Sequence, residues 1–277
     1  MASKKLIFLD IDGTITMPGI PPSAETVSAI RAARENGHLV FLSTGRAPFS
    51  VAKEVAEIGY DGGIYFAGGQ ALLRGECIMD CPLSSDQALA LIEEISDLGL
   101  VLHLEAAHHM YTAGDDKNLN IGRISDASSE LLRRMMQFRD SQSLPLSSYS
   151  GEPIYKIGIV SYCQQQREEL FKRLPQWAKL VWFDNFHSNT TVVAGEISHF
   201  AVTKGLAMEK IANQLGCSTE DCIAFGDSMN DAEILKSAGI GVAMGNSTPE
   251  LKEVADQVCD PCQENGIAKA FKRIKLI

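Results

Sequence analysis

The sequence has no apolar run that approaches the roughly 18 residues needed to cross a membrane. It also has no basic tract, and 35 acidic residues outnumber 25 lysines and arginines, which gives a formal net charge of −10. An acidic surface of this kind argues against nucleic acid or an anionic membrane as the main partner. It also offers no long-range attraction to an anionic substrate, so local groups would have to hold any anion.

The cysteines lack the pattern of a disulfide framework. There are seven, an odd number, scattered along a chain whose first apolar run is too short for a signal peptide. Reduced thiols and a cytoplasmic location are therefore expected. Cys259 and Cys262 form a CxxC pair that Cys77 and Cys81 could complete into a zinc site. Unrelated thiols near loops are the favoured interpretation. A P-loop motif is absent too, which argues against an ATPase of that kind.

The first third of the chain alternates between short apolar strands and amphipathic helices, and the pattern returns after about residue 200. The expected strands are Leu6–Leu9, His38–Leu42, Gly63–Phe66, Cys222–Phe225 and Gly239–Met244. Ser23 and Thr203 are suitable N-caps for two of the helices. Together these features predict an α/β fold with a doubly wound, Rossmann-like parallel sheet.

The middle of the chain has a different order of elements. Its expected segments are a helix at Asp86–Leu98, strands at Leu100–Leu104 and Met110–Thr112, a helix at Ser129–Phe138, a strand at Ile154–Val160, a helix at Gln164–Leu174, and a strand pair at Leu180–Phe183 and Thr190–Val193. This order predicts an α+β domain at 82–188, inserted into a core formed by 1–81 and 189–277. Two short linkers would form a hinge.

Polar clusters follow three of the core strands. They are Asp10–Thr14, Ser43–Arg46 and Gly226–Asp231, while Lys204 lies at a helix start. Ligands of doubly wound sheets bind outside the carboxyl ends of the strands. We therefore expect these four segments, distant in sequence, to converge on one crevice.

The acidic residues of these clusters predict a cation site. Asp10 and Asp12 are two residues apart, so their like charges require a cation or a proton on one of the two carboxyls. Asp227 and Asp231 add two more carboxylates, and an all-oxygen set suits Mg²⁺. Taken singly, a DxD followed by glycine is more often a turn.

Other groups in the same clusters suit an anion. Gly13 allows a close backbone turn that presents N–H groups. Lys204 supplies positive charge, and Thr44 supplies a hydroxyl and a backbone N–H, both suited to phosphate oxygens. A lysine at a helix start is usually solvated, so Lys204 alone does not indicate a phosphate site. The prediction of such a site depends on the three groups occurring together.

In this order the motifs resemble the haloacid dehalogenase-like superfamily, and within it the Cof-type, sugar-phosphatase-like branch. The matching segments are Asp10–Thr14 (DxDGT), Ser43–Arg46 (STGR), Glu196–Lys204, Gly226–Asp231 (GDxxND), Gly241–Asn246 (GVAMGN) and Asn265–Gly266. The resemblance covers the whole core. The middle domain matches the family's large α/β cap, the domain that selects the substrate, in position and length.

The resemblance implies a role for each matching residue. Asp10 would be the nucleophile that becomes an aspartyl-phosphate, and Asp12 the general acid and base. Mg²⁺ would lie between Asp10, the backbone carbonyl of Asp12 and Asp227, with Asp231 at its edge or in the next layer of ligands.

The phosphate ligands follow from the same resemblance. Thr44, Gly45 and Lys204 would hold the phosphate; further candidates for a site role are Ser43, Arg46, Asn230 and Asn246. The chain departs from the family at Gly68-Gly69-Gln70, where Asn-Gly-Ala is usual, and at His199 and Ala201, where Pro and Gly are usual.

The expected function is that of a Mg²⁺-dependent phosphatase acting on small phosphomonoesters, of sugars or other metabolites. Two alternatives stay open: a phosphomutase that uses the same aspartate, and a non-catalytic phosphate sensor. The histidines His103, His108, His109, His187 and His199 could form a metal or substrate site, although separate structural roles are favoured because no ligand spacing accompanies them. The oligomeric state does not follow from the sequence.

Overall fold

The computed structural model describes residues 4–113, 143–182 and 193–277, and these form two compact units. The first unit comprises Met1–Asp80 and Val202–Ile277, and the second comprises Cys81–Ala201. The second unit therefore extends beyond residue 188, where the sequence places its end. The reason is strand β11 (Val193–His199), which pairs with β9 (Ile154–Ser161) and β10 (Ala178–Trp182) of the second unit.

The first unit is built on one sheet with the strand order β14-β13-β12-β1-β2-β3-β4-β5. The strands from β14 to β3 are parallel, and β4 and β5 form an antiparallel hairpin at the edge. Their bounds are β1 Leu6–Leu9, β2 Leu39–Ser43, β3 Gly62–Tyr65, β4 Gln70–Leu73, β5 Glu76–Asp80, β12 Cys222–Gly226, β13 Ile240–Ala243 and β14 Gln257–Val258.

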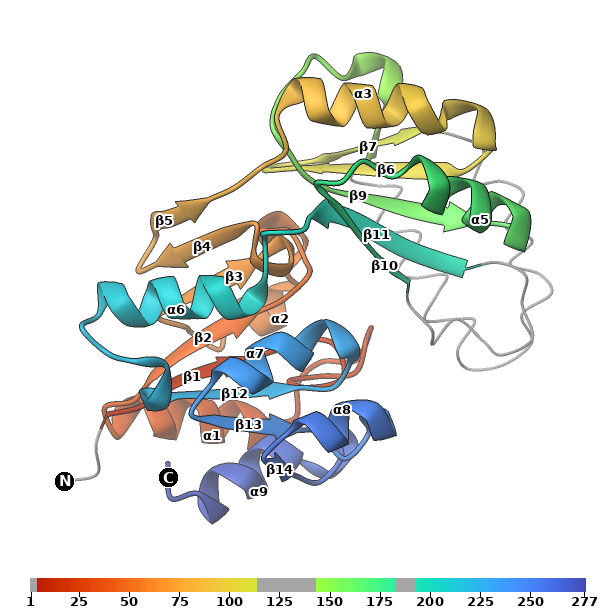
Figure 1. Ribbon diagram of the computed structural model, residues 1–277. Helices are drawn as coiled ribbons and strands as arrows, with labels where there is room; N and C mark the ends of the chain where they lie inside the picture. Colours follow the sequence, from red (N-terminus) through yellow and green to blue (C-terminus); the bar gives the residue numbers. More distant parts are fainter. Residues whose placement is uncertain (1–3, 114–142, 183–192) are drawn as a thin grey trace. The chain divides into compact units, whose positions relative to one another are not determined.

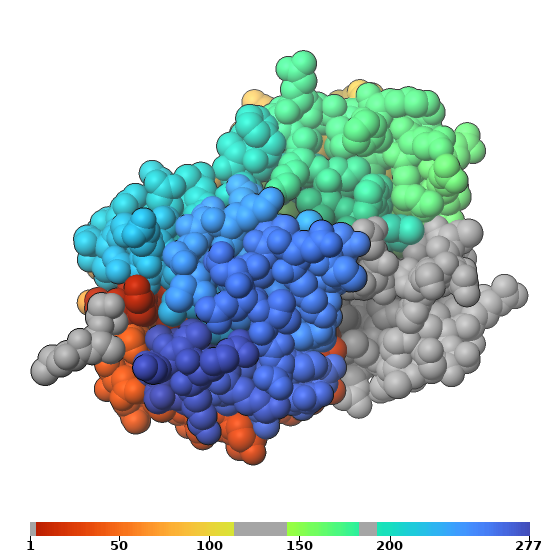
Figure 2. Space-filling model, turned by 60° about the horizontal axis from the view of Figure 1, so that its bottom comes forward, coloured from red at the N-terminus to blue at the C-terminus, as the bar shows by residue number. Residues whose placement is uncertain are grey.

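Helices cover both faces of this sheet (Figure 1). Helices α1 and α9 pack together on one face, and α6 and α7 pack together on the other. Their bounds are α1 Ala24–Glu35, α2 Lys53–Ala56, α6 Lys204–Gln214, α7 Ala232–Ser237, α8 Pro249–Val254 and α9 Gly266–Arg273. The predicted doubly wound α/β fold is confirmed. In Figure 2 the N-terminal and C-terminal stretches of this unit form one continuous body.

The central strand β1 explains why the core forms here. All four of its residues are 0% exposed, because neighbouring strands flank it and helices cover both of its faces. Ile7 and Leu9 pack toward α1 and α9, while Phe8 stacks on Phe41 on the opposite side, with ring centroids 4.9 Å apart. Each fully buried side chain of this size contributes about 1.5–3 kcal/mol to folding.

The register of β1 brings the polar clusters together. Leu9 is paired with Leu42 of β2 on one side and with Phe225 of β12 on the other. The three strands are parallel, so their carboxyl ends lie at one edge, and the segments that begin at Asp10, Ser43 and Gly226 leave the sheet side by side. The predicted convergence is therefore present in the sheet itself.

The second unit contains a six-stranded sheet with the order β10-β11-β9-β6-β7-β8. The remaining bounds are α3 Ser85–Ile95, β6 Val101–Ala106, β7 Met110–Ala113, β8 Ser143–Pro145 and α5 Gln164–Arg173. Residues of α3 and α5 pack on one face of the sheet in a shared apolar cluster (Figure 1). The predicted helix at Ser129–Phe138 lies outside the described residues, as does most of the predicted strand Thr190–Val193.

No helix in the described ranges is long and apolar enough to span a membrane.

Candidate active site

Lys204, at the first turn of α6, is almost completely buried and contacts two carboxylates. Its Nζ donates to Asp10 Oδ1 at 2.8 Å and to Asp231 Oδ1 at 2.6 Å. Burial by itself lowers the pKa of Lys204, but the charges of Asp10 and Asp231 outweigh burial, so the pKa is raised. The lysine is therefore a permanent cation between the end of β1 and the loop after β12.

Asp231 uses both of its oxygens for contacts within the protein. Oδ1 accepts from Lys204, and Oδ2 accepts from the backbone N–H groups of Asp227 at 3.1 Å and Ser228 at 3.3 Å. Its side chain is 0% exposed. Asp231 thus fixes the loop after β12 against the lysine.

Asp10, Asp227 and Asp231 form a cluster whose oxygens lie within 4.8 Å of one another. Burial is the largest cause that raises the pKa of Asp10 to about 7 and the pKa of Asp227 to about 9; the neighbouring carboxylates act in the same direction, and Lys204 opposes them. Three carboxyl groups therefore share one lysine, and without a metal ion Asp10 and Asp227 keep their protons to a higher pH than free carboxyls do. Carboxylate oxygens are the donors that Mg²⁺ prefers, and the ion can replace these protons, so the residues present fit it.

Thr14, for which the sequence predicts no separate role, also contacts this cluster. Its hydroxyl donates to Asp227 Oδ1 at 3.4 Å. The sequence feature that indicates this contact is the position of Thr14 at the end of the DxDGT segment.

Asp12 faces a different cation from Asp10. Arg46 Nε donates to Asp12 Oδ2 and Arg46 Nη2 donates to Asp12 Oδ1, both at 2.7 Å. Each of the two adjacent carboxylates therefore has its own basic partner.

Thr44 lies at the end of β2 and is buried. Its backbone N–H donates to the carbonyl of Ile64 at 2.9 Å, so this N–H is engaged in the sheet, contrary to the expectation that it faces a phosphate. The Thr44 Oγ1 atom accepts from the backbone N–H of Arg46 at 3.1 Å, which leaves the hydroxyl hydrogen to donate elsewhere.

The three further candidates besides Arg46 have different surroundings. Asn246 Nδ2 donates to the carbonyl of Gly13 at 2.9 Å, and Asn246 Oδ1 accepts from the backbone N–H of Cys262 at 2.8 Å, so Asn246 orients loop backbone. Asn230 Oδ1 accepts from the Ser228 hydroxyl within its own loop. The buried Ser43 Oγ has no hydrogen-bond partner in the part of the chain that is described.

Two glycines permit close approaches that build the site. Gly13 has φ +83°, and a Cβ there would lie 2.2 Å from Asp227 Oδ2. Gly68 has φ +110°, and a Cβ there would lie 2.3 Å from the backbone carbonyl of Thr203, next to Lys204. The departure from the family at Gly68 therefore has a structural reason: the loop lies directly against the start of α6.

Replacing Gly68 by alanine is expected to destabilise the protein by about 2–4 kcal/mol, because the positive φ costs about 1 kcal/mol and the clash with α6 costs more. The measurement is urea unfolding. Gly75→Ala is the matched control, because Gly75 has φ +86° but nothing within 4 Å of a Cβ. Equal losses in the two variants would contradict the close packing at Gly68.

The cysteines and histidines do not add a second metal cluster among the described residues, where Asp10, Asp227 and Asp231 are the group close enough to share an ion. All seven cysteines are free. Cys259 and Cys262 lie in the apolar core, and burial raises the pKa of each to about 11.

The described histidines have separate surroundings. His103 contacts Thr112, His109 contacts Tyr111 and Glu152, His199 stacks on Trp177, and His108 is exposed. His187 lies outside the described residues.

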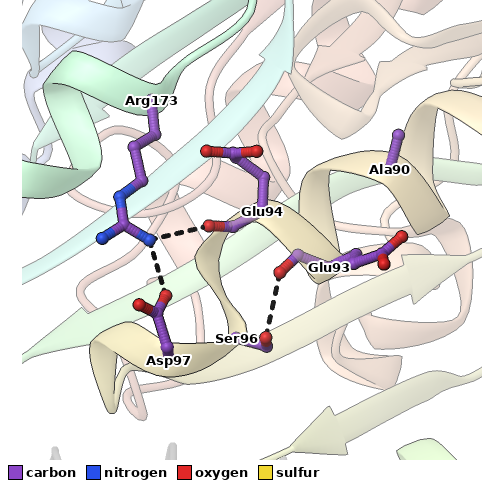
Figure 3. Close-up of a pocket in the computed structure, with 6 residues that line it drawn as sticks. All are labelled: Ala90, Glu93, Glu94, Ser96, Asp97 and Arg173. Atoms are coloured by element: carbon purple, nitrogen blue, oxygen red, sulfur yellow. Dashed lines mark hydrogen bonds and ion pairs between the residues drawn. The ribbon is translucent and has the colours of Figure 1, made fainter.

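A surface hollow in the second unit offers no comparable chemistry (Figure 3). It is lined by Ala90, Glu93, Glu94, Ser96, Asp97 and Arg173. Arg173 Nη1 donates to the Asp97 carboxylate at 2.6 Å and to the carbonyl of Glu94 at 3.0 Å. Exposed pairs of this kind contribute little to stability or binding.

A doubly wound sheet that gathers carboxylates and a buried lysine at the carboxyl ends of its strands is the arrangement of an α/β enzyme with a site for a cation and an anion. The model of the haloacid dehalogenase-like hydrolase family matches residues 7–271, and the chain belongs to this family. The predicted resemblance is confirmed.

Phosphatases of known sequence resemble the chain over nearly its whole length. Phosphatase YwpJ of Bacillus subtilis is 28% identical, with 98% of this chain and 99% of the relative covered. The 5-amino-6-(5-phospho-D-ribitylamino)uracil phosphatase YwtE of the same organism is 29% identical, with 95% and 96% covered. The chain is therefore an enzyme of the phosphatase class.

Solved structures share the fold. A haloacid dehalogenase-like hydrolase from B. subtilis is 26% identical with a TM-score of 0.82, and 98% of this chain and 99% of that chain are covered. A subclass IIB sugar phosphatase, 22% identical with a TM-score of 0.80 over 99% and 100% of the two chains, shows the likeness of the fold alone.

Proposed function

We propose that this phosphatase is Mg²⁺-dependent and hydrolyses small phosphomonoesters through an aspartyl-phosphate on Asp10. The observation that carries the proposal is the 2.8 Å contact between Lys204 and Asp10 inside a cluster of three carboxylates. A nucleophilic carboxylate, a fixed cation beside it and a second carboxylate for proton transfer meet the requirements of covalent phosphoryl transfer.

In the first step Asp10 attacks phosphorus. Lys204 holds Asp10 Oδ1, so Oδ2 is the oxygen that forms the new O–P bond. The bond between phosphorus and the ester oxygen breaks, and Asp12 gives its proton to the leaving alcohol. Lys204 and the Thr44 hydroxyl bind the phosphoryl oxygens, with Gly45 in the same loop.

In the second step water attacks the phosphorus of the aspartyl-phosphate. Asp12 takes the proton of the water, the bond between phosphorus and Asp10 breaks, and inorganic phosphate leaves. The two steps restore Asp10 as a carboxylate and Asp12 as an acid, so the cycle is complete.

Asp10, Asp227 and the backbone carbonyl of Asp12 would hold Mg²⁺. Asp231 would act through its neighbours, because Lys204 and two backbone N–H groups engage its oxygens. When bound, the ion supplies positive charge that offsets the carboxylates and the phosphoryl oxygens.

The proposed substrates are phosphorylated sugars or other small metabolites, with no nucleic-acid or membrane partner. Relatives carry names of this kind, including the ribitylaminouracil phosphatase YwtE and an HMP-PP phosphatase of Serratia proteamaculans that is 26% identical. We propose that the second unit is the cap that selects the substrate. The scattered, odd set of cysteines supports a cytoplasmic location.

A panel of phosphate esters, assayed with Mg²⁺ and after removal of metal by EDTA, tests the proposal. We expect release of inorganic phosphate that depends on Mg²⁺. An isomer of the substrate as the dominant product would favour the phosphomutase instead, and binding without turnover across the panel would favour the phosphate sensor.

A further inference from the structure

Arg46 contacts Asp12 through the fork of its guanidinium group. The two distances, Nε to Oδ2 and Nη2 to Oδ1, are both 2.7 Å. Parallel N–H···O bonds of this length fix both the position and the plane of a carboxylate. Both side chains are partly accessible, at 26% for Arg46 and 33% for Asp12, so this carboxylate stays open to a reactant.

The arginine is itself anchored. Its Nη1 donates to the carbonyl of Ser50 at 3.0 Å, and its backbone N–H donates to Thr44 Oγ1 at 3.1 Å. The loops that carry Arg46 and Asp12 follow strands β2 and β1, which are paired directly. The orientation of Asp12 is therefore set through Arg46 by two loops that leave paired strands of the core.

We propose that Arg46 is a positioning residue for hydrolysis of the phosphoenzyme: it holds the Asp12 carboxylate in the orientation that accepts the proton of the attacking water. This inference rests on the proposed function. It assigns the guanidinium fork to Asp12 and leaves Lys204 and Thr44 to bind the phosphate.

The chemistry of the two steps makes the role of Arg46 separable. Each carboxylate oxygen can accept more than one hydrogen bond, so Asp12 can accept from water while Arg46 holds it. In hydrolysis the O–P bond to water forms, the proton passes to Asp12, and the bond between phosphorus and Asp10 breaks. In the first step with p-nitrophenyl phosphate, the leaving group needs no proton, so that step does not depend on the orientation of Asp12.

The test is rapid-quench kinetics of Arg46→Met with p-nitrophenyl phosphate and Mg²⁺. We expect phosphoenzyme formation within about 3-fold of the wild type and hydrolysis slower by about 10–100-fold, part of the effect of a general base. The phosphoenzyme should then accumulate, and kcat and KM should fall together. Arg46→Lys keeps the charge but not the fork, so its hydrolysis rate should lie between the two.

Arg34→Met is the matched control. Arg34 makes a similar two-point contact with Asp61, at 3.0 and 3.2 Å, but Asp61 precedes β3 and so lies at the opposite edge of the sheet from the site. Arg34→Met should lose about as much stability as Arg46→Met, while its rate constants for phosphoenzyme formation and hydrolysis stay unchanged.

Three results would overturn this inference and leave the proposed function intact. The first is slower phosphoenzyme formation with a raised KM in Arg46→Met, which indicates phosphate binding, and the second is unchanged hydrolysis in that variant. The third is an equal change in the ratio of the two rate constants in Arg34→Met, which indicates general destabilisation. A wild type that turns over esters without forming a phosphoenzyme would refute the proposed mechanism, and this inference with it.

Discussion

Asp10→Asn is expected to lower phosphate ester hydrolysis by about 10⁴-fold or more, because an amide cannot form the acyl phosphate on which the proposed mechanism depends. The loss should appear in kcat for every substrate, including those with good leaving groups. The measurement is release of inorganic phosphate at saturating Mg²⁺, together with intact-mass analysis during turnover.

The fold should survive this substitution. Asparagine is nearly isosteric, and it removes a carboxylate that burial disfavours, while Asp231 stays paired with Lys204. Stability of the metal-free protein should therefore be unchanged or higher, which separates lost chemistry from lost structure.

Asp12→Asn is the companion variant. It keeps the nucleophile, so with p-nitrophenyl phosphate it should accumulate protein that carries one phosphoryl group.

Normal turnover by the Asp10→Asn variant would rule out Asp10 as the nucleophile.

Removal of Mg²⁺ should make the stability of the protein fall as the pH rises from about 4 to about 9. Asp10 and Asp227 have raised pKa values of about 7 and about 9 in the folded state, against about 3.8 when unfolded. Between these limits the folded state binds more protons than the unfolded state, so each rise in pH favours unfolding. Bound Mg²⁺ replaces those protons, and its stabilising effect should therefore grow with pH.

Thermal unfolding with EDTA and with Mg²⁺ measures this effect. At 100 times Kd a ligand contributes about 2.7 kcal/mol, which corresponds to roughly 5–10 °C in Tm for a domain of this size. We expect such a shift near pH 8.5 and a much smaller one near pH 5.5. Asp227→Asn should reduce the shift at the higher pH. Stability that rises with pH in EDTA would contradict the electrostatic account of the carboxylate cluster.

The positions of the backbone segments at the site could be predicted, whereas most side-chain contacts could not. The apolar runs at Leu6–Leu9 and Cys222–Phe225 fix parallel strands, and parallel strands end at a common edge, so the meeting of Asp10 with Asp227 follows from topology. The pairing of Asp12 with Arg46 depends on side-chain directions in two loops, for which the sequence carries no periodic signal.

The structure departs from the sequence analysis for identifiable local reasons. The β4–β5 hairpin is not predicted, because its short strands carry no clear alternation of polar and apolar residues. Its turn is formed by Arg74 and Gly75, which both have positive φ. The segment before Lys204 was assigned to the core by its motif. Its residues Glu196–His199 instead pair in the sheet of the second unit, a long-range interaction that a local motif does not report.

The second unit is an insertion between Asp80 and Val202, and β5 and α6, the elements on either side of it, contact each other within the first unit. Every described residue of the carboxylate cluster, with its lysine and arginine, belongs to the first unit. The strands that carry the reacting groups are therefore not interrupted by the insertion. If the second unit selects the substrate, as proposed, substrate preference and hydrolytic chemistry are encoded in separate stretches of the chain.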